Sequence, residues 1–316
     1  MTSVRVRLQA LACALAACLG ATVASAAPSA PTSMVRTQGA EAARLHALAD
    51  HYFRAAQDLD PLFGTESTGE ERFLDKLEIT IAPQSIARQR ALMLRTERQL
   101  RAIHQDQLPE QDQTTYQLLE RRLALGLESL QFEPELLPID QYGGLPAQMA
   151  QYATGQNLQP FETVAHYQAF LRRLAHLPAW NAQAMANMRR GIARGITQPR
   201  EIVERTIETL RPLAETPAQR HPFAMALQRF PVAVGVADQR RLRAAYQHEI
   251  SVHQLPALRQ LVRFLRDEYL PHARAQAGIG ELPQGAAWYA FRLRESTTTP
   301  LDADTIHRIG LAEVAR

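Results

Sequence analysis

The sequence predicts an all-α fold, and three observations support this prediction. Along most of the 316-residue chain, apolar residues recur at steps of three and four, which is the period of an amphipathic helix. The alternation of apolar and polar residues that is typical of strands is scarce. Proline, glycine and N-capping residues bound the periodic segments. We therefore expect an irregular array of about eight or nine helices after a cleaved signal peptide.

The first residues have the pattern of a secretory signal. Arg5 and Arg7 precede an uncharged apolar run over residues 8–19, and the small residues 24–26 suit a signal peptidase. The run is too short for an integral membrane span, which needs about 20 apolar residues. We expect residues 1–26 to be a signal peptide and the mature protein to be periplasmic or secreted.

Cys18 allows an alternative, in which the chain is a lipoprotein. Residues 15–18 read Leu-Ala-Ala-Cys and resemble a lipobox, in which Cys18 would become the acylated first residue. The apolar run continues past Cys18, which favours cleavage after Ala26. Cys13 and Cys18 are the chain's two cysteines, so a mature protein that begins at Ala27 has no disulfide and no thiolate zinc site.

The remainder of the chain divides into a flexible leader over 27–38, which is rich in Pro, Ser and Thr, and a helical domain over 39–316. Periodicity predicts helices near 37–60, 85–104, 110–132, 163–177, 179–194, 199–213, 238–273, 285–295 and 303–316.

The segment 110–132 has the clearest helical pattern. Five apolar residues lie on one stripe of this helix: Tyr116, Leu119, Leu123, Leu127 and Leu130. Pro109 stands where a first-turn proline is tolerated, and Pro134 closes the segment. The stripe predicts a helix that packs one face against the core.

Other boundaries follow from single residues. Thr163 is a candidate N-cap, and Pro199 can open a helix. Pro256 interrupts a long helical pattern because it lacks the N–H that would reach Val252, so we expect a kink or break at Leu255. Residues 142–144 (Tyr-Gly-Gly) predict a turn.

Composition and charge argue against a nucleic-acid-binding protein. The chain is 46% hydrophobic and 21% charged, which is an ordinary globular balance, and 35 Lys and Arg face 32 Asp and Glu. Its mild basic clusters have acidic residues and few aromatics around them, which is typical of solvated helix faces. These clusters are Arg189, Arg190, Arg194 and Arg200, and then Arg240, Arg241 and Arg243.

The string His248–His253 resembles a zinc motif but has the wrong spacing. A zincin helix carries His-Glu-x-x-His, in which histidines four apart lie on one face. Here the spacing is five, so on a regular helix the two side chains diverge by about 140°. His46 and His51 share this spacing. Although a break near Leu255 would alter the geometry, we expect solvated or capping residues and no metal site.

Residues 64–69 (Gly-Thr-Glu-Ser-Thr-Gly) suggest a phosphate loop or a nucleophile elbow but match neither. A phosphate loop needs Gly-Lys-Ser/Thr after four spacers, and an elbow needs glycines two residues on either side of the serine. We therefore expect a polar loop between helices.

The segment Trp288–Arg292 contains the candidate site residues. Trp288 and Phe291 fit a packed core, whereas Tyr289 and Arg292 lie three apart on one face. A phenol and a guanidinium on one face could line a cleft for a peptide-like carbonyl or carboxylate. The hydroxyl-rich residues 296–300 that follow can cap the next helix.

The chain resembles a bacterial family, the domain of unknown function 885, over roughly residues 40–316. The likeness is carried by Tyr167–Leu174, Met188–Gly191, Gly195–Pro199, Pro256–Leu258, Phe264–Arg274, Leu282–Gly285, Trp288-Tyr289, Thr297–Thr299 and Ile306–Val314. Members of this family are exported proteins that look like zinc metallopeptidases of the zincin type. The resemblance therefore implies an exported, zinc-dependent peptidase as the full-length protein.

The resemblance also implies that this chain lacks the reactive centre. The family's His-Glu-x-x-His pair, its general-base Glu and its further acidic ligand come after the segment that is similar to residues 282–316. No metal-binding or catalytic residue can therefore be carried over, and no cofactor is expected in this chain. Residues 303–316 read as an amphipathic helix without a Gly or Asn stop, so we expect the N-terminal half of a longer protein.

Two functional hypotheses remain open. In the first, the chain is part of a zinc metallopeptidase-like protein, is inactive alone, and has a peptide substrate or the missing C-terminal half as its partner. In the second, it is a non-catalytic all-α periplasmic protein that binds a partner itself. Neither hypothesis involves nucleic acid.

Overall fold

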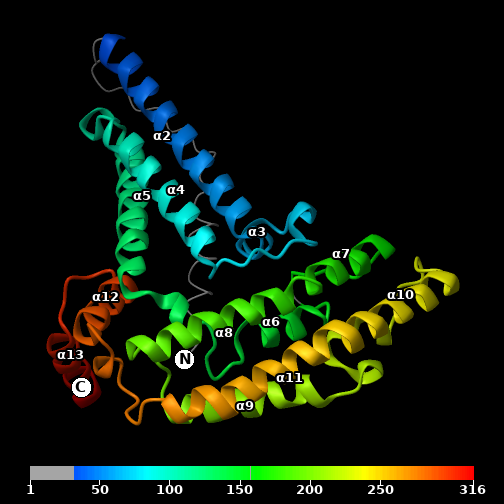
Figure 1. Cartoon of the computed structure of the whole chain (residues 1–316). Coiled ribbons are helices and arrows are strands. Elements are labelled where there is room, and N and C mark those ends of the chain that lie inside the picture. Colours follow the sequence, from blue (N-terminus) through cyan, green and yellow to red (C-terminus); the bar gives the residue numbers. More distant parts are fainter. Residues whose placement is uncertain (1–31, 157) are drawn as a thin grey trace. The chain divides into compact units, whose positions relative to one another are not determined.

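The computed structural model describes residues 32–156 and 158–316, with side chains from residue 39 onward. The predicted signal peptide, Cys18 and the start of the predicted leader lie outside the described residues. The described residues form helices joined by turns and loops (Figure 1), and their only β-type pairing is an isolated bridge between Pro199 and Arg274. The predicted all-α class is therefore confirmed.

The α-helices of the described residues are α2 (Thr32–Leu59), α3 (Pro61–Thr68), α4 (Pro83–Arg101), α5 (Glu110–Ser129), α6 (Gly144–Tyr152), α7 (Val164–Leu174), α8 (Leu177–Arg194), α9 (Arg200–Glu215), α10 (Val236–Glu249), α11 (Leu255–Phe264), α12 (Gly285–Thr297) and α13 (Ala303–Ala315). Short 3₁₀ turns are η1 (Glu71–Phe73), η2 (Gln105–Gln107), η3 (Leu130–Phe132), η4 (Pro134–Leu136), η5 (Ala218–Arg220), η6 (Pro222–Gln228), η9 (Leu270–His272) and η10 (Ile279–Glu281). Helix α2 begins inside the segment expected to be a flexible leader.

The chain forms two compact units. The first contains residues up to 59 and residues 86–131, so it holds α2, most of α4, and α5. Its core includes Leu45, Leu100 and Leu123, which are at most 1% exposed. Tyr116 and Leu119 of the predicted stripe are also buried, whereas Leu127 and Leu130 are half-buried.

The second unit contains residues 60–85 and 132–316. Its core lies among α7, α8, α9, α10 and α11, and Figure 1 shows α9 and α11 running side by side. Helix α9, for example, buries an apolar face formed by Val203, Ile207 and Leu210. Thr163 caps α7 as predicted, because its hydroxyl accepts from the His166 amide over 3.3 Å.

Helices α3 and α6 were not predicted. The prediction of a polar loop over residues 64–69 is wrong, because these residues form most of α3 and its C-cap. Asp60 caps α3 by accepting from the Phe63 amide over 3.2 Å, and Gly69 ends the helix with φ 68°. The ring of Phe73 lies 2.8 Å from where a Cβ on Gly64 would be, so this glycine allows η1 to pack on α3. The signals that point to α3 are therefore an Asp-Pro start and a Gly stop.

The long helical pattern around Pro256 is interrupted by two π-helical turns. These are η7 (Ile250–Gln254), between α10 and α11, and η8 (Leu265–Tyr269), after α11. Pro256 has no N–H to donate, and the helix changes its hydrogen-bonding period immediately before it. The break predicted at Leu255 takes the form of a change in hydrogen-bonding period, because Gln254 and Leu255 keep helical backbone angles and Figure 1 shows that the rod continues from α10 into α11.

Helix α13 differs from the others in the second unit because none of its residues is buried. Its N-cap is Asp302, whose carboxylate accepts from the Thr305 amide over 2.7 Å. The prediction that residues 296–300 cap this helix is therefore wrong. Instead, the Thr297 hydroxyl donates to the Leu293 carbonyl within α12. Within the described part of the chain, no helix has both the length and the apolar character needed to cross a bilayer.

Candidate functional site

Helix α12 carries both residues that the sequence predicts as a binding site. Tyr289 is 46% exposed, so its phenol is open to solvent. Arg292 is half-buried, and its Nη1 donates to Oε2 of Glu295 over 2.5 Å. No hydrogen bond joins Tyr289 to Arg292. The two side chains share a helix and a spacing of three, and each keeps polar atoms that could meet a ligand.

The adjoining face of α12 is packed, as the sequence predicts. Trp288 stacks on Phe132 with ring centres 5.6 Å apart and an interplanar angle of 11°. Phe291 lies 5.4 Å from the same ring. Aromatic pairs at these separations add to the stability that burial provides. This packing fixes α12 to the chain directly before Glu133, where a polar network begins.

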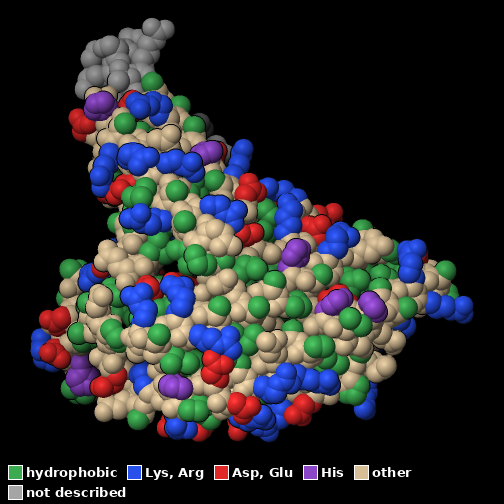
Figure 2. Space-filling model, viewed as in Figure 1, with side chains coloured by type: hydrophobic (Ala, Val, Ile, Leu, Met, Phe, Trp, Pro, Cys, Tyr) green, Lys and Arg blue, Asp and Glu red, His purple; other side chains and the backbone are tan. Residues whose placement is uncertain are grey.

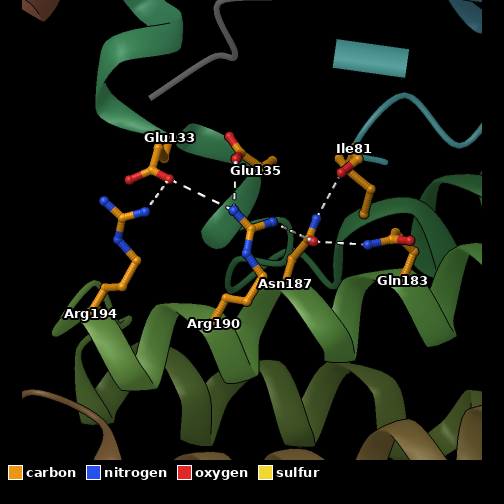
Figure 3. A network of polar contacts seen from close by, with 7 residues as sticks. All are labelled: Ile81, Glu133, Glu135, Gln183, Asn187, Arg190 and Arg194. Carbon is orange, nitrogen blue, oxygen red and sulfur yellow. Dashed lines mark hydrogen bonds and ion pairs between the residues drawn. The ribbon is translucent and has the colours of Figure 1, made fainter. Parts of the chain in front are cut away.

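The network joins η4 to the C-terminal half of α8 (Figure 3). Glu133 adopts a left-handed conformation with φ 49°, which turns the chain into η4. Its Oε1 accepts from Nη1 of Arg194 over 2.7 Å. Nη2 of Arg190 lies between the two carboxylates, 3.7 Å from Oε1 of Glu133 and 3.8 Å from Oε1 of Glu135.

Asn187 extends this network toward the segment before α4. Its Nδ2 donates to the Ile81 carbonyl over 2.8 Å, and its Oδ1 accepts from Nε2 of Gln183 over 2.9 Å (Figure 3). One face of α8 therefore holds two other segments of the second unit. A Cβ on Gly191 would lie 3.3 Å from the Leu136 carbonyl oxygen, so glycine here allows η4 to approach the helix closely.

The charges of the network are balanced, which favours a structural role. Two arginines face two glutamates, so little net charge remains to attract an ionic ligand. Burial raises the pKa of the Glu135 carboxyl, and the neighbouring Glu133 carboxylate adds to this effect. On the face drawn in Figure 2, basic and acidic side chains are likewise interspersed.

A second polar centre surrounds Arg173 on α7. The side chain is fully buried, and its guanidinium donates to the Lys76 and Phe73 carbonyls, to Thr65 Oγ1 and to Gln159 Oε1. Burial lowers the pKa of Arg173 to about 10, so it remains protonated at neutral pH. The sequence signal that we missed is its position, three residues after Phe170 on the apolar stripe of α7.

A short chain of hydrogen bonds lies beside this centre. The Tyr152 hydroxyl donates to Glu66 Oε1 over 2.8 Å, and Gln148 Nε2 donates to the same oxygen over 2.9 Å. Burial raises the pKa of the Tyr152 phenol, so it stays protonated. The Arg173 guanidinium lies 5.8 Å from the Tyr152 ring. The whole arrangement holds α3, η1 and α6 around α7.

The histidines of the described residues do not form a three-ligand metal site. No group of three or more His, Asp or Glu side chains in this part of the chain is placed to hold a metal ion. His166 Nε2 lies 3.4 Å from a Glu71 carboxylate oxygen. The side chains of His248 and His253 were expected to point about 140° apart around the helix. Instead, the centres of their rings lie 6.0 Å apart.

Comparison with known proteins places the chain in a family. Residues 61–316 match the family described as "Bacterial protein of unknown function (DUF885)". The chain belongs to the DUF885 family. The match covers α3 to α13, so both polar centres and α12 lie within the DUF885 region.

The fold of this DUF885 chain is similar to a solved structure, that of the putative lipoprotein from Colwellia psychrerythraea. The TM-score is 0.72 at 18% sequence identity, and the similarity covers 86% of this chain. It covers 49% of the Colwellia chain, so this chain spans about half of that protein's length. No curated protein matches the chain.

Proposed function

We propose that this DUF885 chain is the helical N-terminal part of an exported zinc metallopeptidase-like protein. In this proposal the chain supplies a scaffold and contacts to a peptide substrate. The metal-binding groups belong to a further, C-terminal segment, so the chain is inactive by itself. Zinc in that segment would polarise the peptide carbonyl and activate water.

The observation that carries this proposal is the exposed apolar surface of α13. The exposed apolar residues at and before this helix are Leu301, Ile309, Leu311 and Val314, and Val314 is 89% exposed. Leu311 and Val314 are three residues apart and so share one side of the helix, and contiguous exposed apolar surface on soluble proteins marks contact sites. We infer that the further segment covers α13, which follows α12 and its two candidate site residues in the chain.

Tyr289 and Arg292 are the proposed peptide contacts. A phenol hydroxyl and a guanidinium donate hydrogen bonds to a peptide carbonyl or a terminal carboxylate, and the bond from a guanidinium to a carboxylate is charge-assisted. The stacking of Trp288 on Phe132 holds the helix that presents them. Arg292 would exchange its contact with Glu295 for the ligand.

The proposed location is the periplasm or the cell exterior. The signal-like pattern of residues 1–26 supports export. The Colwellia protein is described as a putative lipoprotein, which supports an anchor through Cys18 as the alternative. Mass spectrometry of the exported chain distinguishes the two, because cleavage after Ala26 leaves an unmodified Ala27, whereas the lipoprotein route leaves an acylated Cys18.

Activity and the adjoining gene sequence test the catalytic half of the proposal. We expect the exported chain to show no chelator-sensitive cleavage of fluorogenic peptides, and the DNA after the codon for Arg316 to encode His-Glu-x-x-His. Peptide hydrolysis by the chain alone, lost on chelation and restored by zinc, would contradict the proposal. An immediate stop codon with unrelated sequence beyond it would favour the non-catalytic binding protein.

Peptide binding tests the proposed contacts. Fluorescence anisotropy with a labelled peptide library should show weaker binding for Tyr289→Ala and Arg292→Ala. Tyr142→Ala is the matched control, because Tyr142 is also exposed, at 63%, and lies between η4 and α6. Equal affinity of the Tyr289 and Tyr142 variants would exclude α12 as the peptide site.

A further inference from the structure

Two histidines that a regular helix would separate are brought together on the rod formed by α10, η7 and α11. His248 lies in the last turn of α10, and His253 lies in η7. Their ring centres are 6.0 Å apart and their planes are nearly perpendicular, at 84°. The spacing of five residues, which argued against a shared ligand, therefore does not separate them here.

The physical reason is the π-helical turn. A π-helix bonds residue i to residue i+5, so residues five apart lie above one another on the same face. A second pair in the same turn shows this alignment, because Nε2 of Gln254 donates to Oε1 of Glu249 over 2.8 Å. Such turns are rare and occur often at functional sites.

The π-turn η7 is fixed by a buried hydrogen bond to α7. Gln254 is fully buried, and its Nε2 also donates to the Leu174 carbonyl over 2.8 Å. This contact joins η7 to the end of α7 within the second unit. The backbone that carries His253 is therefore anchored, and aligning the two rings requires little further ordering.

Both rings are exposed, and their nitrogens are unused. Neither His248 nor His253 makes a hydrogen bond or ion pair with any residue that the structure describes. Other histidines do make such contacts: His46 with Asp112 at 2.6 Å and His221 with the Leu213 carbonyl at 2.7 Å. His248 and His253 are therefore two neighbouring imidazoles whose ring nitrogens are available to bind a ligand.

We propose that His248 and His253 form a surface site for a divalent transition-metal ion, with Cu²⁺ the preferred ion and Zn²⁺ weaker. Imidazole nitrogens suit both metals, and their affinities follow the order Cu²⁺ above Zn²⁺. Two metal–nitrogen bonds of about 2.0–2.1 Å span about 4 Å, and two exposed imidazoles with ring centres 6.0 Å apart can bring one nitrogen each to this separation by rotating about their side-chain bonds. Water completes the coordination shell.

This site goes beyond the proposed function and does not depend on it. A peptidase zinc in a further segment would be a separate site with its own ligands. The two histidines lie on the rod of α10 and α11, whereas the proposed peptide contacts lie on α12. Removing the histidines should therefore leave peptide binding unchanged.

Metal titration of the full chain tests the site. After EDTA treatment and dialysis, isothermal titration with Cu²⁺ should give one tighter site, and electron paramagnetic resonance should show two nitrogen ligands. His248→Ala and His253→Ala should each weaken this site by about tenfold or more, because the second imidazole no longer binds at high effective concentration. Cu²⁺ should also raise the unfolding temperature of the unaltered chain more than that of either variant.

His51→Ala is the matched control. His46 and His51 have the same spacing of five but lie on α2, which is regular α-helix, and His46 already pairs with Asp112. This variant should keep the affinity of the unaltered chain. The proposal fails if the spectrum shows one nitrogen ligand, or if His248→Ala and His253→Ala bind Cu²⁺ as tightly as His51→Ala does.

Discussion

Arg173 on α7 donates from Nη2 to the hydroxyl oxygen of Thr65 on α3 over 2.8 Å, although 108 residues separate them in the sequence. Every hydrogen-bond acceptor of this buried guanidinium is a neutral oxygen, and two of them are backbone carbonyls. A buried cation is tolerated only where its donors are satisfied. The relationship makes Arg173 the centre that holds residues 60–85 against α7.

The first prediction concerns replacement of this cation. Arg173→Met keeps the length of the side chain and removes the donors, which leaves the carbonyls of Phe73 and Lys76 without this partner in the interior. We expect a loss of about 3 kcal/mol or more in the free energy of unfolding, because each buried acceptor left unpaired costs about 1–3 kcal/mol. Urea denaturation, monitored by circular dichroism, measures this loss in the free energy of unfolding.

Arg172→Met is the control for this variant. Arg172 is the adjacent residue, and its Nε makes an exposed ion pair with Asp75 over 3.2 Å. Exposed ion pairs contribute about 0–1 kcal/mol, so its unfolding midpoint should stay close to that of the unaltered chain. If both variants unfold at the same urea concentration, the network around Arg173 does not stabilise the fold as we describe.

The second prediction compares two buried asparagines on α8. Asn187 uses both polar atoms, whereas Oδ1 and Nδ2 of Asn181 have no hydrogen-bond partner among the described residues. Asn187→Leu should therefore destabilise the chain by about 1–3 kcal/mol, whereas Asn181→Leu should leave its stability unchanged or raise it. Thermal unfolding by calorimetry ranks the two variants. The opposite order would show that Asn181 is the bonded residue.

The sequence was sufficient for most helices because their apolar faces are continuous. The structure buries three of the five residues of the stripe predicted for α5, leaves Leu127 and Leu130 half-buried, and buries the apolar faces of α7 and α9. Helices α3 and α6 escaped prediction because each is short, and a short helix is stabilised by packing more than by its own period. At α3 the packing partner is Phe73 of η1.

The polar centres were harder to predict because they join distant segments. Periodicity places Arg173 on the buried stripe of α7, yet it cannot show that Phe73 and Lys76 supply its acceptors. The pairing of His248 with His253 was missed for another reason. The expected divergence of the two rings holds for a regular helix, and the π-turn at η7 changes which residues share a face.

The third prediction concerns close backbone approach at Gly191 on α8. A Cβ here would lie 2.5 Å from the Ile196 carbonyl oxygen, and a backbone atom cannot move away at low cost. Gly191→Ala should therefore lower the free energy of unfolding by about 1–3 kcal/mol. Gly310→Ala on α13 has nothing within 4 Å of the new Cβ and should cost nothing, since alanine favours helix. Equal effects in urea denaturation would contradict the close approach.

The fourth prediction uses two carboxyl groups whose pKa values shift in opposite directions. Burial raises the pKa of Glu135 above its ordinary 4.5, so its ionisation disfavours the folded state. As the pH rises through 4.5 and the range above it, the folded chain loses stability from this group. Glu135→Gln removes that loss. The variant should therefore gain stability relative to the unaltered chain as the pH rises from about 4 to 7.

Glu268→Gln should show the opposite dependence on pH. Nε and Nη2 of Arg189 donate to the two carboxylate oxygens of Glu268 over 2.6 and 2.7 Å, and these bonds lower its pKa below 4.5. The stabilisation that this ion pair gives is present above pH 4.5, and it is lost as the pH falls through the lowered pKa of folded Glu268. This exposed pair is worth less than about 1 kcal/mol, so the variant should be slightly less stable at pH 7, and the difference should shrink as the pH falls below 4.5. Urea midpoints at several pH values measure both variants. If the stabilities of the two variants changed with pH in the same way, burial would not be what sets the pKa of Glu135.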